Sequence, residues 1–238
     1  MGGKEQMKNI GFIGAFDKLD LLLYISKILT MLGKKVVIVD TTLEQKSKYI
    51  VPVISPTKSY ITRFESIDIA VGFETYQEIE RYIGQTENKK MSYDYALVNI
   101  DTIEGFERFH DQETIKDFFV TSFDMYSIRK GLEAISKIQQ PIELSKILFS
   151  SKLTQEDVYY LEYLALGYKI KWNEEIINFP YETNDLEVMM ENEKANKVGM
   201  KNLTPAYREN LEYLITNIMP DIDLANLRRV MKNIEKEG

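Results

Sequence analysis

Five residues suited to phosphate and magnesium chemistry lie in or just after three apolar runs of the sequence. Gly14 closes the run NIGFIGA with Lys18 four residues on, Asp40 ends KKVVIVD, and Asn99 and Asp101 lie in YDYALVNID. Glycine lets backbone N–H groups approach an anion and lysine adds positive charge, so Gly14 and Lys18 are typical of a phosphate loop. The oxygen atoms of Asp40, Asn99 and Asp101 are of the kind that bind magnesium or orient water. The order of a strand, a glycine turn, a long helix and a second strand is how phosphate-binding α/β proteins begin, so the question is whether this turn still binds phosphate.

The elements that must position these residues alternate between strand-length apolar runs and longer segments of helical period. Such alternation predicts an α/β fold: a mostly parallel sheet covered by helices on both faces, formed by a single domain over 1–238. We expect strands at 9–15, 34–40, 93–101, 118–122, 146–150 and 176–180, and helices at 21–32, 75–85, 127–138, 158–166 and, as two C-terminal helices, within 204–236. Region 41–72 is expected to hold loops with a strand or two. Thr154 with Asp157, and Thr204 with Pro205, are typical of helix starts.

Composition excludes several classes of function. The chain of 238 residues has no cysteine, which rules out disulfides and thiolate metal sites. No run of 18 apolar residues occurs, and the polar opening MGGKEQMKN lacks the apolar core of a signal peptide, so we expect a cytoplasmic protein. A net charge of −7 argues against extended contact with nucleic acid, so DNA is not the expected partner.

The order of these pieces resembles the ParA/MinD branch (SIMIBI class) of the P-loop NTPases. The likeness spans roughly 9–186: a glycine turn after the first strand, a long helix, a strand ending in Asp40, the YDY strand, FFVTS before a helix, and NFPYETND. The family includes partition ATPases, division-site selectors and TadZ-like localisation factors of pilus assembly. The resemblance implies a P-loop fold, an ATP site with magnesium, and dimers that act through protein partners.

Residue by residue, the phosphate loop departs from the family pattern. IGAFDKLD, 13–20, aligns with the family's loop, in which Gly14 and Lys18 match. Ile13 replaces the signature lysine, Asp17 the glycine before the catalytic lysine, and Leu19 the magnesium ligand. Two further departures lie outside the loop: Thr42 stands at a water-orienting aspartate and Asn99 at the Walker B aspartate.

The substitutions predict a degenerate nucleotide site. A carboxylate at Asp17 repels a triphosphate and is itself suited to cap the first helix, while Leu19 cannot ligate magnesium. We therefore expect no bound cofactor and no ATPase activity. Three interpretations of single residues stay open beside this one: Lys18 as a solvated lysine paired with Asp17 or Asp20, Asp40 as a cap of the following turn, and Asp101 as a replacement acid two residues beyond Asn99.

Other catalytic patterns are thin. Gly11 and Gly14 lack the G-x-G-x-x-G spacing of a dinucleotide site, and Asp40 lies further along than a ribose-binding acid usually does. His110 is the single histidine, without a nearby nucleophile, and reads as an ordinary surface residue.

The segment 223–236 predicts a basic amphipathic helix. Apolar residues fall on one side and basic residues around them: Leu224, Leu227, Met231, Arg228, Arg229 and Lys232. Three interpretations are open for this helix: packing on its own domain, contact with a partner protein or second copy, and attachment to a membrane surface. A DNA-binding variant would need Arg208, Arg228, Arg229 and Lys232 to form one continuous patch.

Two functional hypotheses follow. The first is a non-catalytic relative of the ParA/MinD proteins that serves as a scaffold or positioning factor through protein contacts. The second is a nucleotide-switched ATPase of that family that uses ATP with magnesium, with ligands such as Lys18 and Asp101. Either would be cytoplasmic, with peripheral attachment to the inner membrane face as a variant.

Overall fold

The computed structural model describes residues 7–52, 57–87, 91–111 and 114–237. Its strands are β1 (Lys8–Ile13), β2 (Val36–Asp40), β3 (Tyr60–Phe64), β4 (Ile67–Val71), β5 (Tyr95–Ile100), β6 (Thr114–Ser122), β7 (Ile142–Phe149) and β8 (Ile170–Phe179). Its helices are α1 (Leu19–Met31), α2 (Ser47–Ile50), α3 (Tyr76–Glu87), α4 (Ile103–Phe109), α5 (Met125–Glu133), α6 (Gln155–Leu164), α7 (Thr183–Ala195), α8 (Pro205–Ile218) and α9 (Leu224–Glu237).

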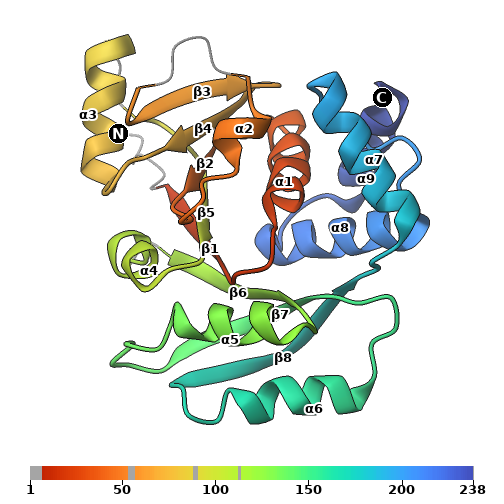
Figure 1. Ribbon diagram of the computed structural model, residues 1–238. Coiled ribbons are helices and arrows are strands. Elements are labelled where there is room, and N and C mark those ends of the chain that lie inside the picture. Colours follow the sequence, from red (N-terminus) through yellow and green to blue (C-terminus); the bar gives the residue numbers. More distant parts are fainter. Residues whose placement is uncertain (1–6, 53–56, 88–90, 112–113, 238) are drawn as a thin grey trace.

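The described strands form one eight-stranded sheet in the order β3-β4-β2-β5-β1-β6-β7-β8 (Figure 1). The β3–β4 pair is antiparallel, and the other neighbouring strands are parallel. The carboxyl ends of the parallel strands therefore lie along one edge of the sheet, and α/β proteins of this kind bind their ligands at that edge. The predicted mostly parallel sheet is confirmed.

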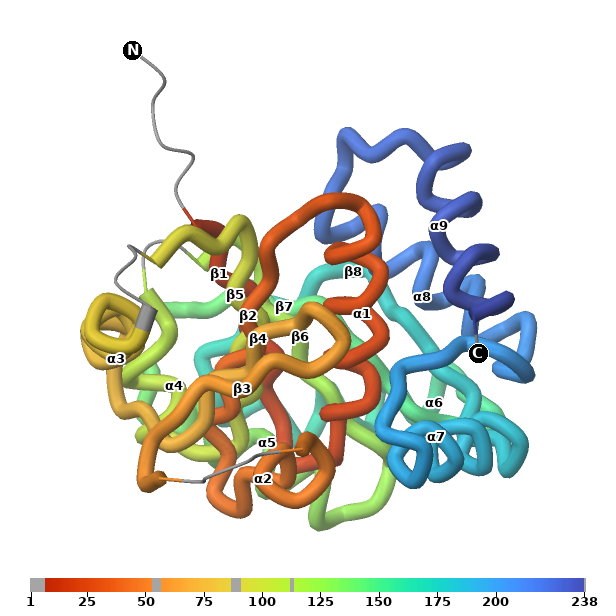
Figure 2. The backbone as a smooth tube through the Cα atoms, turned by 90° about the horizontal axis from the view of Figure 1, so that it is seen from above, coloured from red at the N-terminus to blue at the C-terminus, as the bar shows by residue number. Residues whose placement is uncertain are grey.

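Helices cover both faces of this sheet, as predicted. One face packs against α1, α7, α8 and α9, and the other against α3, α4, α5 and α6 (Figures 1 and 2). Side chains alternate along β1 because successive residues of a strand point to opposite faces. Ile10 and Phe12 lie in the first core, and Ile13 lies in the second.

Helix ends follow the local sequence signals. Thr154 and Asp157 form the predicted capping box at the start of α6, and Thr204 caps α8 with Pro205 in its first turn. Gly33 ends α1 with a φ of +84°, a conformation that favours glycine. Three described helices, α2, α4 and α7, have no counterpart in the sequence predictions. In α7 the apolar residues Val188, Met189 and Met190 are consecutive, which blurs the helical period.

Region 41–72 contains α2, β3 and β4, so the predicted loops with a strand or two are confirmed for its described part. Positions 53–56, which include part of the apolar piece YIVPVI, lie outside the described residues.

The C-terminal helix packs on its own domain. Leu227, Val230, Met231 and Ile234 of α9 are buried in the core shared with α1 and α8, and Leu224 is 46% exposed. Of the three interpretations that the sequence left open for this helix, the burial of Leu227 and Met231 supports packing on its own domain.

Three of the four basic residues that a DNA-binding patch would need, Arg208, Arg228 and Lys232, line one surface hollow, where carboxylates lie among them. Arg208 pairs with Glu235, Arg228 with Glu212, and the Arg229 Nη2 atom donates to Asn226 at 2.7 Å. Lys232 is exposed and lines a surface hollow that also contains Glu209, Glu212 and Glu235. Carboxylates thus offset the arginines locally.

Among the described helices, none has the length and apolar character needed to cross a bilayer.

Candidate functional site

The carboxyl ends of β1, β2 and β5 meet at a cavity of about 240 Å³. The structure brings together several of the predicted residues along its wall: Gly14, Asp17, Lys18, Thr42, Asn99 and Asp101. Ile13 and Leu19 do not reach it, because both side chains are buried in the two cores. The Leu19 side chain therefore packs in the core and offers no oxygen atom to a metal ion.

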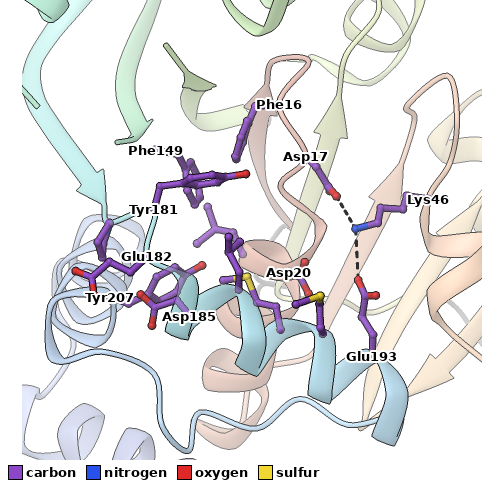
Figure 3. A pocket seen from close by; sticks show the side chains of 15 residues that line it. Phe16, Asp17, Asp20, Lys46, Phe149, Tyr181, Glu182, Asp185, Glu193 and Tyr207 are labelled. Carbon is purple, nitrogen blue, oxygen red and sulfur yellow. Dashed lines mark hydrogen bonds and ion pairs between the residues drawn. The ribbon is translucent and has the colours of Figure 1, made fainter. Parts of the chain in front are cut away.

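Asp17 occupies the N-terminus of α1. It lies one residue before Lys18, the N-cap residue, and its Oδ1 atom accepts a hydrogen bond from the backbone N–H of Leu19 at 3.2 Å, so it satisfies one free N–H group of the first turn. Its Oδ2 atom lies 2.5 Å from Nζ of Lys46, which also approaches Glu193 at 3.4 Å (Figure 3). A carboxylate and its counter-ion thus stand at the helix end where this architecture places an anion.

Lys18 is buried, which makes the solvated-lysine interpretation wrong. Its side chain is 3% exposed, and Nζ donates to the carbonyl oxygen of Gly14 at 2.6 Å. Burial lowers the pKa of Lys18 to about 8, against the opposing effect of Asp101, Asp17 and Asp40. The Lys18 ammonium group therefore binds its own loop, and it loses its proton at a lower pH than a solvated lysine does.

The acids of the site also serve the local backbone. Asp40 accepts from the N–H of Thr42 at 3.2 Å and from its hydroxyl at 2.6 Å, and it contacts the Ser47 hydroxyl, so the cap interpretation is confirmed. Asp101 accepts from the N–H of Leu43 at 3.0 Å. Burial raises the pKa of Asp101, which the Leu43 hydrogen bond and Lys18 oppose.

The charges on the wall of this cavity balance one another. Asn99 leaves a buried Oδ1 atom without a hydrogen-bond partner, the one feature here that suits a ligand. The cavity wall carries three lysines and three carboxylates, so it lacks the positive excess that a triphosphate needs. Within the described residues no three acidic or histidine side chains are grouped to hold a metal ion.

Among the residues of this wall that were not predicted from the sequence are Lys46, Tyr126 and Lys130. Lys46 follows β2 in a loop, and the two others lie on α5, where exposed residues of these types are ordinary. Their involvement depends on the strand order, which places β6 beside β1. His110, expected to be an ordinary surface residue, instead places Nε2 2.9 Å from Oδ2 of the buried Asp117.

A second cavity, of about 380 Å³, adjoins the first through Phe16, Asp17 and Lys46. It lies between α1 and α7 and was not predicted (Figure 3). Asp20, in the first turn of α1, lines it. Burial raises the pKa of Asp20 to about 6, with Lys46 acting in the opposite direction.

The raised pKa of Asp20 predicts a pH-dependent stability. A carboxyl whose folded pKa exceeds its unfolded value stabilises the fold when protonated, and that contribution is lost as the pH rises from about 4 through about 6. Asp20→Asn is therefore expected to raise the free energy of unfolding by about 1–2 kcal/mol at pH 7.5 and by much less at pH 4. Urea denaturation at the two pH values measures this. An equal effect at both would contradict the assigned cause.

Comparisons with known proteins find likeness in structure alone. No family model matches the sequence, and no curated protein matches it. A chain of the MinC:MinD cell division protein complex of Aquifex aeolicus is 17% identical, with 91% of this chain and 97% of that one covered at a TM-score of 0.54. A putative plasmid partition protein of Borrelia burgdorferi B31, bound to AMPPNP, is 12% identical, with 91% of this chain and 100% of that chain covered at a TM-score of 0.55. A ParA family ATPase of Chlorobium tepidum TLS is 14% identical, with 98% of this chain and 97% of that chain covered at a TM-score of 0.50.

The sheet order, the glycine turn after β1 and these matches define the class: an α/β protein of P-loop NTPase architecture. Within that class, the fold is ParA/MinD-like. The fold predicted from the sequence is thereby confirmed, and the site has to be read from this chain's own residues because fold does not fix function.

Proposed function

We propose that this chain is a non-catalytic ParA/MinD-like protein that acts in the cytoplasm as a scaffold or positioning factor. The observation that carries the proposal is the Asp17 carboxylate at the N-terminus of α1, held there by Leu19 N–H and Lys46. A phosphate group at that helix end would have to displace this carboxylate or lie against it.

Electrostatics makes that displacement costly. Two like charges ~4 Å apart at an effective dielectric constant of ~20 repel by about 4 kcal/mol, which is roughly a thousandfold in affinity. Lys18 offsets part of this repulsion, because a pKa of about 8 leaves it mostly charged near pH 7, but its Nζ atom already donates to Gly14. Without a metal ligand at Leu19, hydrolysis would also lack the charge stabilisation that phosphoryl transfer requires.

A surface suited to protein contacts supports the scaffold role. Six exposed apolar or aromatic residues lie on α5, on α6 and just after α6, here called the tyrosine patch: Met125, Tyr126, Tyr159, Tyr160, Tyr163 and Leu166. The Tyr160 hydroxyl reaches Met125 at 3.4 Å, which joins the two helices. Exposed clusters rich in tyrosine are typical of protein interfaces. One of the similar structures is itself a complex between two proteins, MinC and MinD.

The competing hypothesis is a nucleotide-switched ATPase. One of the similar structures, the Borrelia partition protein, holds AMPPNP, and in this chain Lys18 and Asp101 both line the cavity at the carboxyl ends of β1, β2 and β5. The two hypotheses differ in whether Asp17 leaves the helix end.

Nucleotide titration separates them. With a fluorescent ATP analogue and magnesium, we expect no saturable binding below about 1 mM, because Asp17 and its cap must be displaced. Asp17→Gly is expected to strengthen binding at least tenfold, since one repelling carboxylate is gone. Leu19→Thr should bring no such gain, because this side chain lies in the core.

Asp221→Asn is the matched control: it removes the same charge from an exposed residue that lines neither cavity. Micromolar binding by the unmodified chain would reject the degenerate site. Equal gains from Asp17→Gly and Asp221→Asn would show that net charge, and not the helix cap, limits binding.

A further inference from the structure

The cavity between α1 and α7 has the walls of a small-molecule site. Its volume of about 380 Å³ falls in the range that such sites occupy, about 300–1,000 Å³. The apolar side chains that line it come from three stretches of the chain, at 16–21, 149 and 181–190: Phe16, Leu21, Phe149, Tyr181, Leu186, Met189 and Met190. The ring of Phe16 packs at 4.6 Å from Phe149 and 6.1 Å from Tyr181, measured between centroids (Figure 3).

The charges around this cavity are strongly unbalanced. Five carboxylates and one lysine line it: Asp17, Asp20, Glu182, Asp185, Glu193 and Lys46. Lys46 is shared between Asp17 and Glu193, and Asp185 accepts from the N–H and hydroxyl of Thr204. A net negative, apolar-walled space favours a positively charged guest and disfavours phosphate or carboxylate.

A second, independent feature points to a ligand. Tyr207 lines the cavity, is 1% exposed, and its hydroxyl has no hydrogen-bond partner. Buried hydroxyls are nearly always hydrogen-bonded, because an unmade bond costs about 1–3 kcal/mol. Burial raises the pKa of Tyr207, and the nearby Tyr24, Asp20 and Asp185 add to the shift, so the hydroxyl stays neutral and lies close to two carboxylates. The oxygen is itself buried, so a guest's N–H group donates to it only after the cavity wall shifts.

We propose that this cavity binds a small organic cation, a primary ammonium group carried on an aromatic or aliphatic body. The ammonium lies between Asp20 and the Tyr207 hydroxyl, and the apolar body lies against the Phe16, Phe149 and Tyr181 rings, whose faces also attract a cation. The inference stands apart from the nucleotide question, because it rests on Asp20 and Tyr207, which do not line the neighbouring cavity.

Three probes of one shape test the charge requirement: 2-phenylethylammonium, the neutral 2-phenylethanol and the anionic 3-phenylpropionate. Isothermal titration and saturation-transfer NMR at pH 7.5 are expected to show saturable binding of the ammonium with a Kd of about 1 mM or lower. The alcohol should bind at least tenfold more weakly, and the carboxylate should not bind. Equal binding of ammonium and alcohol, or no saturation by the ammonium at 10 mM, would overturn the proposal.

Variants locate the binding. Asp20→Asn is expected to weaken ammonium binding about tenfold, because a charge contact is lost. Tyr207→Phe is expected to weaken it about fivefold, because one hydrogen bond is lost. Asp221→Asn removes the same charge elsewhere and should leave the Kd unchanged. Melting curves check that each variant is folded. Equal effects of Asp20→Asn and Asp221→Asn would overturn the proposal by reducing it to general surface attraction.

The pH dependence gives a further readout. Ammonium binding should tighten between pH 5 and 7 as Asp20 ionises, since its pKa is about 6. Asp17, Glu193 and Lys46 face the same space, as do Glu182 and Asp185 from α7 and its start. Asp20→Asn should therefore flatten this slope, and an unchanged slope in that variant would contradict the role of Asp20.

Discussion

Gly14→Ala is expected to lower the free energy of unfolding by more than about 3 kcal/mol, enough to leave little soluble protein. Gly14 has a φ of +149°, where L side chains are strained. An added Cβ would also stand 2.0 Å from the carbonyl oxygen of Val120 in β6, a rigid backbone atom. The Gly14 N–H meanwhile donates to Ile100 O at 2.9 Å, so the loop cannot shift without losing its tie to β5. Urea denaturation measures the loss.

Two other glycines separate the causes of this effect. At Gly33 an added Cβ meets nothing within 4 Å but φ is +84°, so Gly33→Ala should cost about 1 kcal/mol from backbone strain alone. At Gly167 the space is open and no such φ occurs, so Gly167→Ala should change stability by less than about 0.5 kcal/mol. If Gly14→Ala lowered the free energy of unfolding no more than Gly33→Ala, that result would contradict the close approach of the loop to β6.

Leu227→Ala should lower the free energy of unfolding by about 2–5 kcal/mol, the cost of a core cavity. Leu227 is fully buried where α9 packs against the first core. Leu224→Ala, three residues earlier on the same helix, provides the control. That side chain is 46% exposed, so its loss should cost less than about 0.5 kcal/mol.

This pair also decides the role of the C-terminal helix. Losses of equal size would mean that α9 does not pack as described. They would favour contact with a partner protein or attachment to a membrane surface instead. A large loss for Leu227→Ala alone makes α9 part of the domain, so removing 223–238 should abolish the cooperative unfolding transition.

Local patterns made much of the fold predictable. The runs around β1, β2 and β5 are continuous apolar stretches, and buried parallel strands need such stretches on both faces. Helices with clear caps, such as α6 and α8, were equally visible. The helix α7 was not, because its apolar residues are consecutive and two of the three residues that it buries, Asp185 and Asn192, are polar.

The candidate site was predictable only in part. The sequence indicated that Asp17 would cap α1, because an acid at a helix start binds free N–H groups within a few residues. It could not indicate that Lys46, 29 positions away, pairs with that acid, or that Lys18 turns inward to Gly14. Such contacts depend on how the loop after β2 crosses the end of β1.

The sequence by itself determined the alternating elements, the phosphate-loop position and the residues missing from it, because these are properties of neighbouring positions. The tertiary structure alone decided what fills the site and what lies beside it. Burial of Lys18, the orphaned Tyr207 hydroxyl and the acidic cavity between α1 and α7 arise from segments far apart in the chain. Their exposure and charge balance are fixed only when the sheet orders its strands and the helices close over it.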